Sequence, residues 1–110
     1  MPKGMLFVES RPADPAREDE YNEWYSRTHI PEVCAVPGIV AARRYRVHRA
    51  SGGEAEPSAP AYVAVYDIDS DDLDGPLREL GIRAGDGRVR MSDAIQMDPP
   101  PTVTIYELVE

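Results

Sequence analysis

The stretch Ala61-Tyr62-Val63-Ala64-Val65-Tyr66-Asp67-Ile68 decides the fold of this 110-residue chain, because it is the clearest β-strand in the sequence. β-Branched and aromatic residues favour strands, and successive side chains of a strand point to opposite faces of a sheet. Tyr62, Ala64 and Tyr66 therefore share one face, and the valines between them lie on the other. The segment predicts a sheet of which one face packs against helices.

Three further strands and two helices are predicted around this strand. Asp14 and Pro15 begin a helix before it, since Asp caps free amides and Pro is tolerated at the first helical position. Leu73, Leu77 and Leu80 follow it at helical spacing and form the apolar stripe of a second helix. Runs of β-forming residues predict the other strands over 4–9, 39–49 and 102–109.

The resulting order is β-α-β-β-α-β, which is typical of the ferredoxin-like α+β fold. In this fold two helices cover one face of a four-stranded antiparallel sheet. A bare second face with Val, Ala, Ile and Tyr side chains requires a partner on so small a domain. We therefore expect residues 1–110 to form one domain that pairs with a second copy of itself.

Composition excludes several classes of function. The formal net charge is −8 and the isoelectric point is near 4.7, which argues against binding to nucleic acid or to an anionic membrane. We expect a cytoplasmic protein, since no apolar run spans a bilayer and the N-terminus does not read as a signal peptide. A single cysteine and two distant histidines argue against a disulfide or zinc site, and no glycine-rich phosphate loop indicates a nucleotide cofactor.

The first predicted helix carries the best candidate for acid–base chemistry. Tyr21, Tyr25 and His29 lie on one stripe of this helix, facing the space between helix and sheet, and Pro31 is expected to bend or end it. An imidazole exchanges protons near neutral pH, and an aromatic substrate could stack on the neighbouring rings. The alternative is that His29 is only a cationic cap at the end of the helix.

The segment Tyr21-Asn22-Glu23-Trp24-Tyr25-Ser26-Arg27-Thr28-His29-Ile30-Pro31-Glu32-Val33, followed by Val36-Pro37-Gly38 and the strand 41–45, resembles the EthD-like branch of the dimeric α+β barrel superfamily. The shared pattern is an aromatic pair, a His-x-Pro and a Pro-Gly before the second strand. The resemblance implies a homodimer in which this histidine is the usual functional position. Its members include cofactor-free monooxygenases, polyketide cyclases, EthD-type decarboxylases, isomerases and haem-degrading enzymes. The polar haem ligand of the last group is missing here, so no cofactor is expected.

Further candidates lie on the strands and beside His29. Tyr66 is preferred as the phenol that holds a substrate oxygen, and Arg44 suits a carboxylate or phenolate. Simple packing for the tyrosines and Trp24, and surface ion pairing for Arg44, are the alternatives. We assign catalysis to His29 and Tyr66. Six residues are predicted to bind substrate: Tyr21, Trp24, Tyr25, Arg44, Tyr62 and Tyr106.

The sequence therefore predicts a cofactor-free, metal-free enzyme that acts on a polyketide-like or aromatic oxygenated small molecule. Proton transfer at His29 would lead to cyclisation, dehydration or decarboxylation. One alternative is a cofactor-free monooxygenase of phenols or hydroquinones. The other is a dimeric binding or accessory protein without catalysis.

Overall fold

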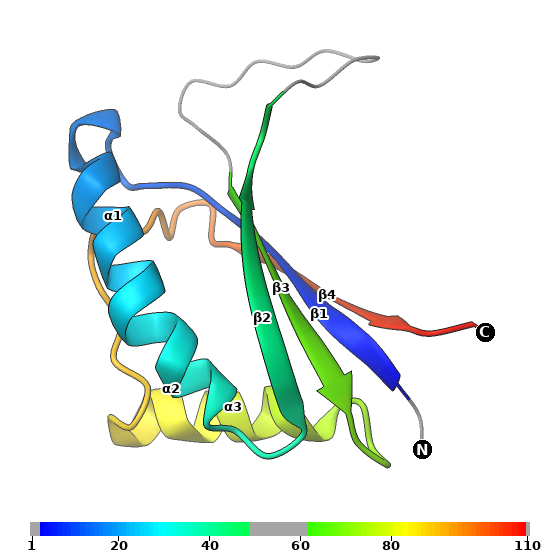
Figure 1. The fold of residues 1–110 in the computed structure, drawn as a ribbon. Helices are drawn as coiled ribbons and strands as arrows, with labels where there is room; N and C mark the ends of the chain where they lie inside the picture. The colour runs from blue at the N-terminus through cyan, green and yellow to red at the C-terminus, as the bar shows by residue number, and fades with distance from the viewer. Residues whose placement is uncertain (1–2, 49–61, 110) are drawn as a thin grey trace.

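The computed structural model describes residues 3–48 and 62–109 and contains the predicted elements in the predicted order (Figure 1). The strands are β1 (Lys3–Ser10), β2 (Ile39–Arg46), β3 (Tyr62–Asp69) and β4 (Thr102–Glu107). The α-helices are α1 (Glu18–Trp24), α2 (Ile30–Cys34) and α3 (Gly75–Asp86). The predicted strand ends at positions 49 and 61 lie outside the described residues.

The four strands form one antiparallel sheet in the order β2-β3-β1-β4, with all helices on one face (Figure 1). Leu6 pairs with Tyr66 on one side and with Ile105 on the other, so all three side chains point to the helices. The ferredoxin-like α+β fold predicted from the sequence is thereby confirmed. β4 is shorter than predicted: its register with β1 ends at the pair Gly4 and Glu107, and the amide of Leu108 makes one further bond to the carbonyl of Lys3.

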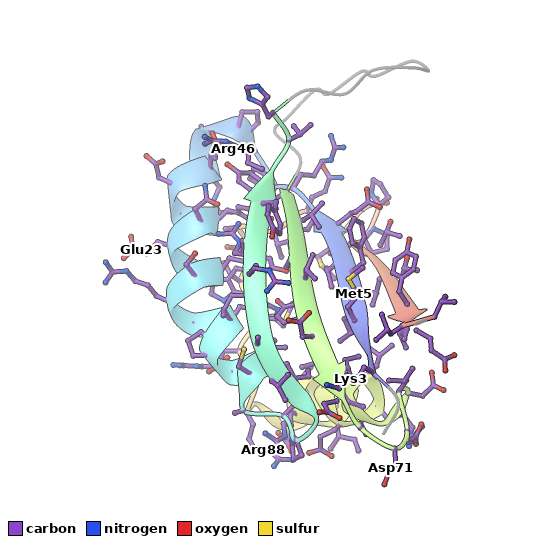
Figure 2. The ribbon with its side chains drawn as sticks, turned by 45° about the vertical axis from the view of Figure 1, so that its right-hand side comes forward. Lys3, Met5, Glu23, Arg46, Asp71 and Arg88 are labelled. Carbon is purple, nitrogen blue, oxygen red and sulfur yellow. The ribbon has the colours of Figure 1, made fainter. Side chains whose placement is uncertain are left out.

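The helix-free face of the sheet is more polar than we predicted. Figure 2 shows this face, with Met5 near its centre. An ion pair between Arg43 and Asp67 interrupts it at 3.5 Å. The expected isoleucines are absent from it, since Ile68 and Ile105 belong to the register positions that face the helices.

The first helix does not end at Pro31. A 3₁₀ turn over Pro15–Arg17, capped by the Asp14 carboxylate, leads into α1, and a π-helical turn over Tyr25–His29 joins α1 to α2 without a break. In this turn the amide of Ile30 donates to the carbonyl of Tyr25, five residues earlier. The wider turn accommodates a proline that has no amide to donate, so the helix continues to Cys34.

The core lies between the helices and the sheet, as the alternation of β3 predicted. Tyr21, Tyr25 and Tyr66 are among its largest fully buried side chains, and Leu77 and Leu80 of α3 pack against it. α3 continues through two glycines and ends at Gly87, whose φ of +88° suits glycine. No helix in the described part of the chain is long and apolar enough to cross a membrane.

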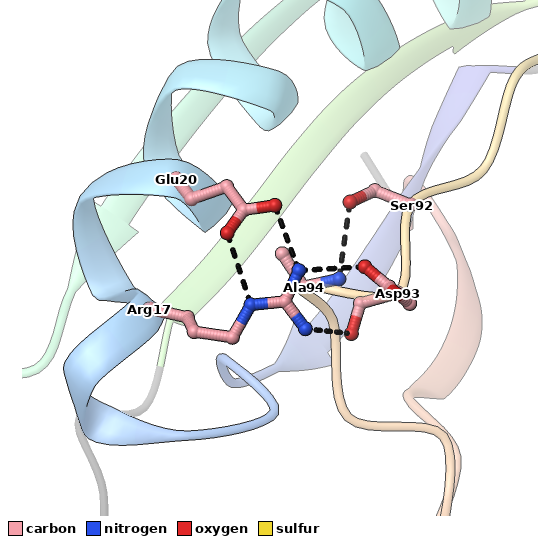
Figure 3. A network of polar contacts seen from close by, with 5 residues as sticks. All are labelled: Arg17, Glu20, Ser92, Asp93 and Ala94. Atoms are coloured by element: carbon pink, nitrogen blue, oxygen red, sulfur yellow. Dashed lines mark hydrogen bonds and ion pairs between the residues drawn. The ribbon is translucent and has the colours of Figure 1, made fainter.

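An irregular segment over 87–101 returns from α3 to β4 along the first helix. Arg17 bonds both Glu20 on its own helix and Asp93 of this segment, the latter at 2.6 Å (Figure 3). Farther along the helix, Glu32 accepts bonds from the backbone amide and the Nε of Arg90, each at 2.7 Å. These contacts hold the segment against the helix and close one side of the core.

Candidate functional site

A cavity of about 160 Å³ lies between the first helix, α3 and the sheet. Its polar wall consists of His29, Tyr25 and Tyr66. The rest of the lining is apolar and includes Leu6, Val33, Leu77, Leu80, Val89, Met91 and Val103. A concave apolar space with a few polar groups at one end is the usual form of a small-molecule site.

The π-helical turn fixes the position of His29. Its ring stacks on Trp24, with centroids 4.8 Å apart and planes inclined by 28°, and meets the edge of Tyr25 at 5.0 Å. Trp24 and His29 are five residues apart, which is the spacing of neighbours on a π turn rather than on an α-helix. His29 therefore lies inside a continuous helix, and the alternative of a cap at the helix end is wrong.

Burial keeps the His29 imidazole neutral at pH 7. It lowers the pKa of His29 to about 4; the carboxylate of Glu32 raises this pKa and the charge of Arg44 lowers it. Nδ1 is buried and has no hydrogen-bond partner among residues 3–48 and 62–109. A buried polar atom without a partner is costly, so this nitrogen has an unmet hydrogen bond in a residue that lines the cavity.

Two phenols complete the polar wall. The hydroxyl of Tyr66 donates to that of Tyr25 across 3.4 Å. Burial raises the pKa of both phenols. The hydrogen bond with Tyr66 lowers the pKa of Tyr25, whereas Tyr25 raises the pKa of Tyr66. At neutral pH both are protonated, so this end of the cavity combines a neutral base with two phenol hydroxyls, one of which donates to the other.

Arg44 and two of the predicted tyrosines form a separate cluster at the edge of the sheet, under α1. The guanidinium carbon lies 4.4, 5.3 and 5.5 Å from the ring centroids of Tyr25, Tyr62 and Tyr21. Its Nη atoms donate to Ser26 and Asn22. Tyr21 and Tyr62 also have protein partners, which are Ser10 for the first and Glu18 with Asn22 for the second. Tyr21, Tyr62 and Arg44 therefore do not line the cavity, in contrast to their predicted contact with substrate.

Tyr106 and Trp24 also lie away from the cavity. Tyr106 pairs with Met5 in the register, so it lies on the helix-free face of the sheet, where its ring meets the edge of Phe7 at 5.9 Å. Trp24 lies behind His29 and donates from Nε1 to the carbonyl of Arg90. Trp24 thus holds His29 in place, as the packing alternative proposed.

The sequence did not identify two parts of the site. The segment over 87–101 supplies Val89, Met91 and Ile95 to the cavity wall, and none of the candidate residues predicted from the sequence lies in it. The other part is Glu32, which lies one helical turn after His29 and raises its pKa. The spacing of three residues on one helix could have predicted this electrostatic interaction.

Comparisons with known proteins find similarity in fold and little similarity in sequence. No family model matches the chain, and no curated protein matches it. A dimeric ferredoxin-like protein from an uncultured marine organism is 11% identical, with a TM-score of 0.64 over 100% of this chain and 98% of the other. An ethyl tert-butyl ether D (EthD) family protein from Bacillus halodurans is 17% identical, with a TM-score of 0.58 over 96% and 99%. A monooxygenase of Streptomyces coelicolor in complex with the ligand nanaomycin D is 17% identical, with a TM-score of 0.50 over 97% and 88%.

The chain has the ferredoxin-like fold of the EthD-like proteins. In this EthD-like fold the segment that carried the sequence resemblance forms the helix above the cavity, and its His-x-Pro places His29 in the cavity wall. Within residues 3–48 and 62–109, no group of three or more His, Cys, Asp or Glu side chains is arranged to hold a metal ion.

Proposed function

We propose that this chain is a cofactor-free small-molecule enzyme in which His29 transfers a proton on an oxygenated substrate. The observation that carries the proposal is a neutral imidazole with an unpartnered buried nitrogen, beside two protonated phenols at one end of an apolar cavity. Groups whose pKa values are shifted by burial in a cavity are typical of active sites.

In this mechanism the imidazole of His29 takes a proton from a phenol or from carbon next to a carbonyl. The electron pair stays on the substrate as a phenolate or enolate, whose oxygen accepts hydrogen bonds from Tyr25 and from Tyr66, the hydroxyl of Tyr66 turning to it from Tyr25. The imidazolium and the anion attract each other strongly in a cavity that excludes water, which offsets the low basicity of the buried ring. Attack of the enolate carbon on a second carbonyl of the same molecule, with the proton passed from His29 to the new alkoxide, would give cyclisation. Transfer of the proton to a hydroxyl on the neighbouring carbon, which leaves as water, would give dehydration. In a β-keto acid His29 would instead take the carboxyl proton, CO₂ would leave, and the proton would return to the enolate carbon.

The size of the cavity narrows the substrate class. An apolar protein cavity of roughly 150 Å³ is enough to bind benzene. The cavity of about 160 Å³ therefore favours a substrate with one aromatic or polyketide-derived ring that carries its oxygens near His29. The remaining walls suit a short apolar substituent.

The test is turnover of a panel of single-ring phenols and cyclic 1,3-diketones, with proton exchange into D₂O followed by NMR. His29→Phe keeps an aromatic ring against Trp24 but removes the base, and we expect it to lose at least 100-fold in rate. Tyr66→Phe should lose about tenfold or more, whereas Tyr106→Phe removes a phenol from the opposite face and should retain full rate. Full turnover by His29→Phe would overturn the proposal.

A cofactor-free monooxygenase is the second candidate, and the structural neighbour that is a monooxygenase in complex with a ligand favours it. Removal of the phenol proton by His29 would give an electron-rich phenolate, and the substrate itself would then supply the electrons to dioxygen. Oxygen consumption on phenols or hydroquinones, lost in His29→Phe, separates this reaction from proton transfer alone. Binding of these molecules without any turnover would instead support an accessory protein.

We also propose that the chain acts as a homodimer through the helix-free face of the sheet. Met5 and Val65 are half-buried there, and a hollow of about 510 Å³ lies at one end of this face, beside Val40, Tyr106 and Leu108. The dimeric ferredoxin-like neighbour supports this assembly. Native mass spectrometry tests it, and a stable monomer would contradict it. A cytoplasmic location stays a prediction.

A further inference from the structure

Arg44 places a half-buried positive charge next to the cavity but not in its wall. Its guanidinium lies against Tyr21, Tyr25 and Tyr62, and its Nε is buried without a partner in the described part of the chain. No carboxylate among the described residues lies within ion-pair distance of it, although the neighbouring Arg43 pairs with Asp67 on the other face. The hydrogen-bond acceptors of Arg44 are the neutral side chains of Ser26 and Asn22.

A charge that is withdrawn from water without a counterion costs free energy. The three aromatic faces and two neutral acceptors recover part of this cost, because cation–π contact is favourable where water is excluded. The carboxylate of Glu18 accepts a hydrogen bond from the hydroxyl of Tyr62, one of the rings against the guanidinium. The positive charge of Arg44 is thus left for another negative partner.

We propose that Arg44 is a positioning residue that supplies a fixed positive charge, through the ring of Tyr25, to an anion formed in the cavity. The inference rests on the proposed function, since it assigns a role in the same site. Tyr25 connects Arg44 to the cavity. The guanidinium carbon lies 4.4 Å from the centroid of the Tyr25 ring, and Tyr25 lines the cavity with its hydroxyl next to that of Tyr66. In this role Arg44 does not contact the substrate. The role therefore differs from the direct substrate contact that the sequence predicted for Arg44.

The pKa values of the surrounding groups agree with this geometry. The charge of Arg44 lowers the pKa of His29, Tyr25 and Tyr66 together, which indicates that its field reaches the whole polar wall. Glu32, one helical turn after His29, changes the pKa of His29 in the opposite direction. The larger effect of burial still keeps both phenols protonated at neutral pH.

The first test uses the ligand-free protein and compares Arg44→Gln with Arg43→Gln. Both variants remove one positive charge from adjacent positions of β2, but only Arg44 faces the helices. The titration of His29, followed by NMR of its ring protons, should move upward from about 4 in Arg44→Gln and stay in place in Arg43→Gln. Arg44→Lys retains the charge and should restore most of the wild-type value. Equal titrations of the two Gln variants would overturn the inference.

The second test uses 4-nitrophenol as a probe, because its phenolate absorbs visible light. Bound to the wild-type protein, the probe should be more ionised than in water at the same pH, and Arg44→Gln should lower the ratio of its ionised to neutral form by about tenfold. Arg43→Gln should leave this ratio unchanged. If neither Arg44→Gln nor Arg44→Met folds, the test uses the wild-type protein alone. The inference is then refuted if the probe bound to the wild type is less ionised than the free probe at the same pH. Failure of the probe to bind at all would count against the proposed site, while the His29 titration would still decide the role of Arg44.

Discussion

Acidification should destabilise this protein through His29 alone by about 2 kcal/mol between pH 7 and pH 5. The pKa of His29 is about 4 in the folded protein against 6.5 for an unperturbed histidine, because the folded protein buries the ring. The unfolded chain therefore binds a proton that the folded protein refuses, and stability is lost as the pH falls below 6.5. One pKa unit corresponds to about 1.4 kcal/mol, so at pH 5 the 1.5 units below that value cost about 2 kcal/mol. The loss approaches its limit of about 3.5 kcal/mol below pH 4.

Urea unfolding at pH 7 and pH 5, at one fixed protein concentration, measures this loss. His29→Phe keeps the stack on Trp24 without a titrating group, so its loss of stability between the two pH values should be about 2 kcal/mol smaller than that of the wild type. His48→Gln is the matched control, because His48 is exposed beyond the end of β2 and should leave the wild-type loss unchanged. Equal losses for wild type and His29→Phe would refute the account of a buried neutral imidazole.

Three other substitutions test the fold around the site. Gly85→Ala should stabilise the protein by about 0.5–1 kcal/mol in thermal unfolding, because the added Cβ meets no other atom and glycine inside a helix is costly. Gly4→Ala should destabilise the protein by several kcal/mol, because its Cβ would meet a backbone carbonyl of β4. Glu32→Ala should speed hydrogen exchange of the Arg90 amide more than that of the sheet amides, since Glu32 is its acceptor; a uniform change would show that the contact does not hold the segment. Val65→Lys should give a folded monomer in native mass spectrometry if the helix-free face pairs two copies, and a persistent dimer would contradict that interface.

The fold could be predicted because each element has a strong local signal. The alternation in β3 fixed which tyrosines are buried, and the leucine spacing of α3 identified the second helix. The face of Tyr106 could not be derived in the same way, because its direction depends on the register between β4 and β1. Arg44 was predicted to bind substrate, whereas its contact with the tyrosine rings depends on how α1 crosses β2, which the sequence does not show. The alternation along a strand therefore predicts which side chains share a face of the sheet, but it does not predict which residues of a helix each side chain contacts.

The position of His29 shows how a residue that was expected to end a helix instead shapes the site. Pro31 has no amide, and the π turn that accommodates it brings residues five apart onto one another, so Trp24 lies under His29. The same tryptophan is tied by Nε1 to Arg90 in the segment that closes the cavity. The stacked ring cannot turn outward to water without leaving Trp24 and the edge of Tyr25. Proline therefore contributes indirectly to the low pKa of His29, because the turn that it requires places the imidazole where protonation is costly.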